Sequence, residues 1–260
     1  MYLTRRTWRK VPQVTIFFWI IKVLTTAMGE ATSDYSVHRV DPVLAVALGT
    51  VGLVAALVLQ LKARRYIAPA YWLAVVMVAI VGTMAADVMH IVVGVPYAVS
   101  TAGFAVALAI VFAAWHRTEG TLSIHSIFTL RRELFYWATI MVTFALGTAA
   151  GDLTAYTLRL GFLSSGLLFA GVMAIPVLAH RFTRLNDVLV FWFAYIFTRP
   201  LGASFADWMG VPGHLGGLNW GRGTVSVGLT ILIVTLVGYV TLSRVDVEDE
   251  GALPAVTVRA

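Results

Sequence analysis

The sequence predicts an all-α integral membrane protein with eight transmembrane helices, arranged as four parallel two-helix repeats. Three observations support this fold class: 59% of the 260 residues are hydrophobic and 12% are charged, charge-free apolar runs recur along the chain, and one motif occurs four times. A run of ~20 apolar residues is long enough to cross a bilayer core of ~30 Å as a helix. These runs are continuously apolar, whereas the strands of a membrane β-barrel alternate in polarity.

The repeated motif consists of an aromatic residue, Trp, nine further residues, Gly, four further residues and Asp. Its copies begin at Phe18, Tyr71, Tyr136 and Phe191 and end at Asp34, Asp87, Asp152 and Asp207. Because no copy needs a gap, one supersecondary unit has been used four times. We expect a single membrane domain with repeat units of approximately 13–65, 66–118, 131–184 and 186–244, followed by a cytoplasmic tail over 245–260.

Within each repeat, the first span carries the motif and the second is a charge-free run. The clearest of these runs are 43–61, 98–115, 162–179 and 225–242. Two spans per repeat leave all repeats in one orientation, so a pseudo-fourfold or pseudo-twofold axis along the membrane normal relates them. The intramembrane charges fall on the odd-numbered spans. Because a charge in lipid is costly, we expect the odd helices inside and the even helices facing lipid.

Basic residues gather at one set of helix ends. They are Arg5, Arg6, Arg9, Lys10, Lys62, Arg64, Arg65, Arg117, Arg131, Arg132, Arg181, Arg184 and Arg244. The opposite loops hold Arg39, Arg159 and Arg222. The positive-inside rule therefore places both termini in the cytoplasm. It also explains the net charge of +6 without a nucleic-acid partner, and the absence of cysteine excludes disulfides and zinc–thiolate sites.

The motif residues have different expected roles. The Trp, near the cytoplasmic start of each odd helix, is typical of an interfacial anchor. The Gly permits either close helix approach or a local break of the helix. The Asp lies fifteen residues after the Trp, ~22 Å further along a continuous helix. Four such carboxylates that converge would repel one another unless a cation or a proton joins them. The alternative is that each Asp bonds a neighbouring group.

Two of the motif helices carry further charges at four-residue intervals. These stripes are Lys22, Thr26, Glu30 and Asp34 on the first helix, and Arg199, Ala203 and Asp207 on the seventh. Residues four apart share a helix face. Lys22 and Arg199 are therefore candidate counter-ions or gating residues, and a structural ion pair is the alternative. Five intramembrane acids against two bases favour a cationic ligand or protonated carboxylates.

A metal site made of carboxylates is the predicted chemistry. Its expected ligands are Asp34, Asp87, Asp152, Asp207 and Glu30. Carboxylates without thiols suit a hard cation such as Mg²⁺, Mn²⁺, Ca²⁺, Na⁺ or H⁺. His90 follows Asp87 by three residues, a spacing that suits a proton relay or a metal-ligand pair. The alternative is that His90 is an interfacial residue without a functional role. No cofactor and no catalytic residue is expected.

Four segments resemble a known family. They are Lys10–Thr15 (KVPQVT), Gly29–Asp34 (GEATSD), Ala145–Asp152 (ALGTAAGD) and Thr198–Ser204 (TRPLGAS). The chain resembles bacterial integral membrane proteins built from four tandem copies of a repeat of unknown function, each with two spans and a characteristic tryptophan. The resemblance covers nearly the whole chain and implies the bacterial inner membrane and eight spans. It implies no catalytic residue and no substrate.

The expected function is a membrane transporter or channel for a small cation, for example a divalent metal such as Mn²⁺ or Mg²⁺, with proton coupling through the carboxylates. An alternative is a carrier of a small organic solute, with Tyr35, Tyr156, Trp208 and Trp220 lining its pocket. A second alternative is an intramembrane lipid-modifying enzyme, although the chain lacks closely spaced carboxylates and a Ser/His/Asp arrangement. Beyond the solute and the bilayer no partner is predicted, and the oligomeric state stays open.

Overall fold

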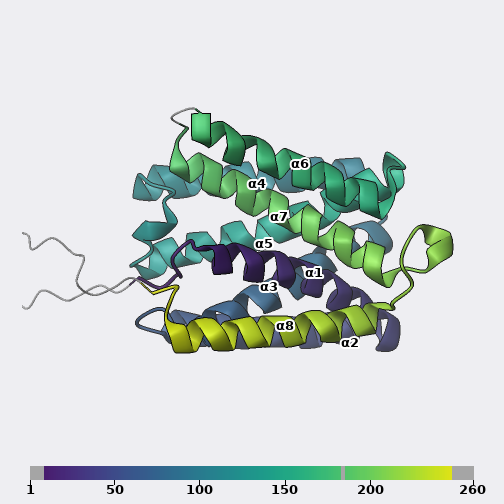
Figure 1. The fold of residues 1–260 in the computed structure, drawn as a ribbon, viewed down its shortest axis with the longest axis horizontal. Coiled ribbons are helices and arrows are strands. Elements are labelled where there is room, and N and C mark those ends of the chain that lie inside the picture. Colours follow the sequence, from purple (N-terminus) through teal and green to yellow (C-terminus); the bar gives the residue numbers. More distant parts are fainter. Residues whose placement is uncertain (1–8, 183–184, 248–260) are drawn as a thin grey trace, which may run out of the picture.

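The computed structural model describes residues 9–182 and 185–247, and every regular element in this part of the chain is helical (Figure 1). The long helices are α1 Ile16–Arg39, α2 Pro42–Lys62, α3 Ala68–Asp87, α4 Tyr97–Glu119, α5 Leu130–Asp152, α6 Gly161–Phe182, α7 Asp187–Gly210 and α8 Arg222–Ser243. Short elements are the π-helical η1 Val88–Val92 and η3 Leu153–Thr157, and the 3-10 helices η2 Ile124–Ser126 and η4 Gly213–Leu215. The all-α prediction is confirmed. Arg5, Arg6, Arg184 and most of the predicted tail, 248–260, lie outside the described residues.

Local sequence signals start several of these helices. The side chain of Thr15 accepts a hydrogen bond from the Phe18 amide at the start of α1, and that of Asp41 accepts one from the Leu44 amide at the start of α2. Asn186 caps α7 in the same way, through the amide of Val188. Such caps satisfy amide groups that have no partner within the helix. Proline inside α6 and α7 does not end either helix.

Helices α2 to α8 are long and apolar enough to cross a membrane, by length and composition. Helix α1 has 24 residues but carries Lys22, Glu30 and Asp34 within its length. The outer helices display large aliphatic side chains, and Val43, Ile110, Leu178 and Leu242 are between 62% and 87% exposed. Exposed apolar surface on this scale marks a surface that meets lipid or another apolar partner. The chain is therefore a membrane protein in its composition and in its surface.

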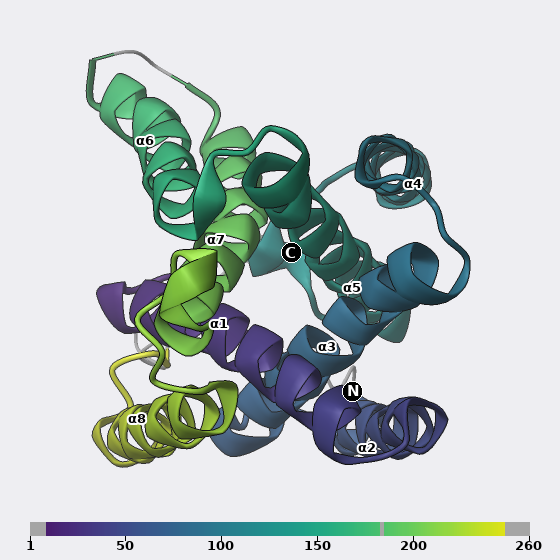
Figure 2. The ribbon, with the colours of Figure 1, turned by 90° about the vertical axis from the view of Figure 1, so that its right-hand side faces the viewer.

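Four helices form a closed ring. Helix α1 packs against α3 and α7, and α5 packs against the same two helices from the opposite side (Figure 2). The remaining four helices lie outside this ring. Helix α2 covers α3, α4 covers α5, α6 covers α7, and α8 covers α1. Each outer helix thus lies chiefly against the inner helix that follows it in sequence, and α8 closes the circle by packing on the first.

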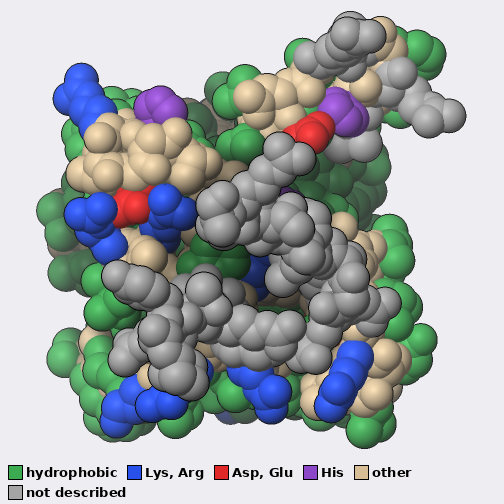
Figure 3. Space-filling model, turned by 90° about the vertical axis from the view of Figure 1, so that its left-hand side faces the viewer, with side chains coloured by type: hydrophobic (Ala, Val, Ile, Leu, Met, Phe, Trp, Pro, Cys, Tyr) green, Lys and Arg blue, Asp and Glu red, His purple; other side chains and the backbone are tan. Residues whose placement is uncertain are grey.

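The two ends of the bundle differ in chemistry. One end, here called the tryptophan end, holds the start of α1, the end of α8 and the connections that lead into α3 and α5 (Figure 1). Lysine and arginine side chains gather there around the rim (Figure 3). The opposite end, here called the aspartate end, carries the four motif aspartates at or near the last turn of the inner helices. Each inner helix runs from the tryptophan end to the aspartate end.

The motif glycines lie where neighbouring ring helices touch. The contacts are Gly29 with Ala79, Gly82 with Phe144, Gly147 with Arg199, and Gly202 with Thr26. In every case the partner stands three residues before the next motif glycine around the ring. A Cβ at Gly29 would lie 2.4 Å from the Ala79 Cβ, and one at Gly82 would lie 2.6 Å from the Phe144 Cβ. Because the helices are unbroken at these positions, the glycines serve close approach.

Replacing Gly29 by Ala should destabilise the ring by about 1–3 kcal/mol, because the added methyl group overpacks a contact with the backbone of α3. Gly103→Ala on α4 is the matched control, since its Cβ would have no neighbour within 4 Å. That control should be neutral or stabilising, because alanine is the better helix former. Thermal unfolding of the purified protein in detergent measures both. Equal melting temperatures for the two variants would contradict the close-contact role.

Candidate functional site

Equivalent positions of the four inner helices form five layers along the ring, each four residues from the next. From the tryptophan end they are the aromatic layer (Phe18, Tyr71, Tyr136, Phe191), the lysine layer (Lys22, Val75, Ile140, Tyr195), the arginine layer (Thr26, Ala79, Phe144, Arg199), the glutamate layer (Glu30, Thr83, Thr148, Ala203) and the aspartate layer (Asp34, Asp87, Asp152, Asp207). Residues four apart occupy one face of a helix. All twelve residues of the three middle layers are buried.

Arg199 joins all four inner helices. Its Nη1 donates to the carbonyl oxygen of Thr26 at 3.3 Å, and its Nη2 donates to the Glu30 Oε2 at 2.5 Å. The same Nη2 donates to the hydroxyl groups of Thr83 and of Thr148, the latter at 2.6 Å. The guanidinium is fully buried. Charge-assisted hydrogen bonds of this kind are stronger than neutral ones, so one side chain of α7 holds α1, α3 and α5.

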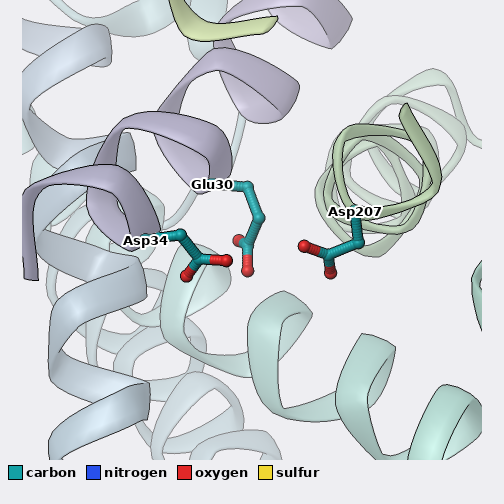
Figure 4. A group of neighbouring side chains, drawn as sticks. All are labelled: Glu30, Asp34 and Asp207. Carbon is teal, nitrogen blue, oxygen red and sulfur yellow. The ribbon is translucent and has the colours of Figure 1, made fainter. Parts of the chain in front are cut away.

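Three carboxylates meet at the aspartate end, and we call them the carboxylate group. One oxygen from each of Glu30, Asp34 and Asp207 lies within 4.8 Å of the others, and the side chains point toward a common centre (Figure 4). Glu30 is paired with Arg199, and Asp34 is paired with the Nε of Arg222 at 2.7 Å. Within the described part of the chain, the 8%-exposed Asp207 has no ion pair within 4 Å. The group therefore has three carboxylates and two paired bases.

The other two motif aspartates lie beside this group, outside its closest set. Asp87 and Asp152 are half-buried and stand at the last α-helical residue of α3 and of α5. Both interact electrostatically with Glu30 and Asp34. Directly after each of them the helix widens into a π-turn, a feature often found at functional sites. Of the four motif aspartates, Asp34 on α1 and Asp207 on α7 thus belong to the carboxylate group. Asp87 on α3 and Asp152 on α5 lie beside that group.

Lys22 has no carboxylate partner. Among the described residues its Nζ meets no hydrogen-bond acceptor, and it lies 4.0 Å from the ring centroid of Phe144 and 4.2 Å from that of Tyr195. The counter-ions of the carboxylate group are instead Arg199, as predicted from its place in the stripe, and Arg222. From its sequence position, Arg222 is expected only in a loop. Its sole sequence signal is that it is one of the three bases Arg39, Arg159 and Arg222 in the loops of the aspartate end.

His90 is not joined to Asp87. Its Nδ1 lies 3.0 Å from the carbonyl oxygen of Val95 and its Nε2 lies 3.3 Å from the Ser100 hydroxyl. The π-helical segment that begins at Val88 has more residues per turn than an α-helix, so a spacing of three no longer puts both side chains on one face. The contacts of His90 close the turn before α4.

The aromatic residues near the aspartate end do not form one lining. Tyr156 stacks on Tyr97 with ring centroids 5.9 Å apart, and Tyr35 lies against the backbone of Gly223. Trp208 packs beside Val211, whereas Trp220 is exposed. The predicted set of Tyr35, Tyr156, Trp208 and Trp220 is therefore spread over different helix pairs.

The tryptophan end is tied by its own polar contacts. Lys10 Nζ pairs with the buried Glu133 at 2.6 Å, and Arg132 pairs with Glu119 at 2.7 Å. After α8, the Tyr66 hydroxyl donates to Asp246 at 2.5 Å. Burial raises the pKa of Asp246 above its usual range. These contacts connect segments that precede α1 and follow α8 to the loops between repeats.

Removing one partner of the buried Arg199–Glu30 pair should cost about 3–5 kcal/mol of stability, because the remaining charge is left buried and unpaired. We expect this loss for Arg199→Gln and for Glu30→Gln. The double variant should recover part of it, since neither charge then remains. A double-mutant cycle of unfolding free energies in detergent measures the coupling. Losses that simply add would mean that the two side chains do not depend on each other.

Comparison with known proteins gives one finding. A family model described as Repeat of Unknown Function (DUF347) matches residues 17–66, 70–121, 135–186 and 190–246. Each matched segment contains one copy of the motif from aromatic residue to aspartate. The predicted resemblance to a four-repeat family is confirmed. No curated protein and no solved structure matches the chain.

Proposed function

The chain belongs to this family of four tandem repeats of unknown function, and we propose that it is a membrane transporter or channel for a small cation. Glu30, Asp34 and Asp207 form the cation site in this proposal. Asp87 and Asp152 supply further negative charge beside it. The most suitable cation by ligand type is a hard one, for example Mg²⁺ or Mn²⁺, since every side chain of the group offers carboxylate oxygen.

The proposed topology has eight spans in the bacterial inner membrane. Helix α1 is the eighth span, because α3, α7 and α8 pack against it and its charged side chains Lys22 and Glu30 are buried. The repeats are then related by an axis along the membrane normal. The basic rim supports a cytoplasmic location of the tryptophan end in this proposal, and with it cytoplasmic termini (Figure 3). The carboxylate group faces the opposite side.

The observation that carries the proposal is the close approach of three carboxylates with two paired bases. Like charges at this separation repel one another unless a positive charge lies between them. Arg199 and Arg222 neutralise two carboxylates, and Asp207 remains without an ion pair among the described residues. A bound cation or a proton would supply the missing charge. Exchange between the two would couple cation movement to protons.

The axis is closed on the cytoplasmic side of this site. The guanidinium of Arg199 occupies the space between Glu30, Thr83 and Thr148, and no acidic layer follows it toward the tryptophan end. A cation that binds Glu30 competes with Arg199 for the same carboxylate. Arg199 is therefore the gating residue in this proposal: its release from Glu30 opens the path, and its return closes it.

The test is cation flux in proteoliposomes with Mn²⁺, Mg²⁺, Ca²⁺, Zn²⁺, Na⁺ and H⁺. Wild-type protein should carry a subset of these ions, and Asp34→Asn combined with Asp207→Asn should reduce the flux to that of empty liposomes. The matched control is Asp41→Asn. Asp41 is an exposed aspartate at the same end whose capping role asparagine retains.

The proposal fails if folded wild-type protein carries none of these ions, or if the double variant carries them as well as the control does. In the first case, flux of an organic solute would favour the alternative of an organic carrier. The stacked pair of Tyr97 and Tyr156 at the aspartate end would then be the first place to look for its binding site.

A further inference from the structure

The surroundings of Lys22 are unusual for a buried lysine. The side chain has no exposed surface, and within the described chain its Nζ has no hydrogen-bond acceptor. The Nζ lies over two aromatic rings instead, 4.0 Å from the ring centroid of Phe144 on α5 and 4.2 Å from that of Tyr195 on α7. A cation over an aromatic face is attracted by the negative charge of that face, most strongly where water is excluded.

Ion pairing does not explain this lysine. The other charged group facing it is Arg199, whose Cζ lies 5.3 Å from the centroid of the same Phe144 ring, so the nearest charged neighbour of Lys22 is a like charge. From α3 the lysine layer receives Val75, and from α5 it receives Ile140, both apolar. Glu30 lies eight residues away on α1, ~12 Å along the helix, and is bonded to Arg199.

We propose that Phe144 and Tyr195 form a second cation site on the ring axis, for a small monovalent ammonium ion, and that Lys22 occupies it as a tethered ligand. The site has aromatic faces and no carboxylate, so it suits an alkylammonium group, whereas a hard divalent metal needs oxygen ligands. Phe144 belongs to the arginine layer and Tyr195 to the lysine layer, so the site lies on the tryptophan-end side of the carboxylate group and goes beyond the cation site proposed above.

The site is also the next obstacle on the axis. Toward the tryptophan end it follows Arg199 by one layer, and beyond it lie the hydrogen-bonded hydroxyls of Tyr71 and Tyr136. The Nζ of Lys22 contacts both rings, so this side chain occupies the space between the inner helices in the lysine layer. Any ion that follows the axis must displace the Lys22 ammonium from the rings, so the same side chain that fills the site closes the path.

The experiment replaces the tethered ligand by a free one. Lys22→Ala deletes the part of the side chain beyond Cβ, which n-propylammonium matches in length and charge. Propylammonium should raise the melting temperature of purified Lys22→Ala by about 2–4 °C. It should leave the wild type unchanged, because there the site is filled. The neutral isostere 1-propanol, at equal concentration, should have no such effect on the variant.

A second variant shows where the ammonium binds. In Lys22→Ala with Phe144→Leu the aromatic face is gone while an apolar lining remains, and the rise with propylammonium should disappear. An equal rise with 1-propanol, or a rise that persists without Phe144, would overturn the proposal, because the space would then be an apolar hole. The absence of any response in Lys22→Ala would overturn it as well.

Should Lys22→Ala not fold by itself, the readout is the yield of monodisperse protein purified in propylammonium against 1-propanol. Recovery with the ammonium alone supports the site, and equal recovery or none overturns it. All of these measurements report binding to folded protein and need no transport. Their outcome is therefore separate from that of the flux panel, and either proposal can fail while the other stands.

Discussion

The buried guanidinium of Arg199 is the interaction on which the rest of the structure depends. A charge inside a membrane bundle is costly unless its donors are satisfied, and here one side chain of α7 bonds groups of the other three inner helices. This requires the helices to approach closely. Gly147 provides the space beside Arg199, where a Cβ would lie 2.3 Å from its Cγ. The hydrogen bonds of Arg199 thus depend on the small motif residues, because these residues let the inner helices come close enough to form them.

The ring shape follows from the same constraint. The buried charges within the helices lie on the inner helices, so the outer helices can be apolar between their ends, where valine, leucine and isoleucine side chains are exposed. Each motif glycine contacts the inner helix of the next repeat, and Gly202 of α7 completes the circle at Thr26 of α1. The closed circle buries the charged side chains of Lys22, Glu30 and Arg199 between the inner helices.

Four similar repeats nevertheless build an uneven interior. Repeats one and four supply Glu30, Lys22 and Arg199, and the closest carboxylates lie on α1 and α7. Repeats two and three supply the π-helical turns after Asp87 and Asp152 and the apolar side of the lysine layer. The backbone repeats four times, whereas the buried charged side chains of the three middle layers come from repeats one and four and the π-helical turns from repeats two and three.

Much of this could be predicted from residue order. Apolar run length determines helices that suit a bilayer, and the constant spacing of Trp, Gly and Asp determines which faces are equivalent, because an α-helix has a fixed rise and twist. The stripe from Lys22 to Asp34 on α1 was readable for this reason. Contacts within one helix, such as that stripe, depend on local geometry alone.

The partners across the ring were decided by the tertiary structure. Arg222 pairs with Asp34 although 188 residues separate them, since α8 packs back on α1, and no local pattern encodes that return. The π-helical turn after Asp87 turns His90 away from it, and the spacing of the two residues does not reveal this turn. Lys22 meets aromatic rings of α5 and α7 across the ring. The sequence by itself determined which residues share a face, and the closing of the ring determined which faces meet.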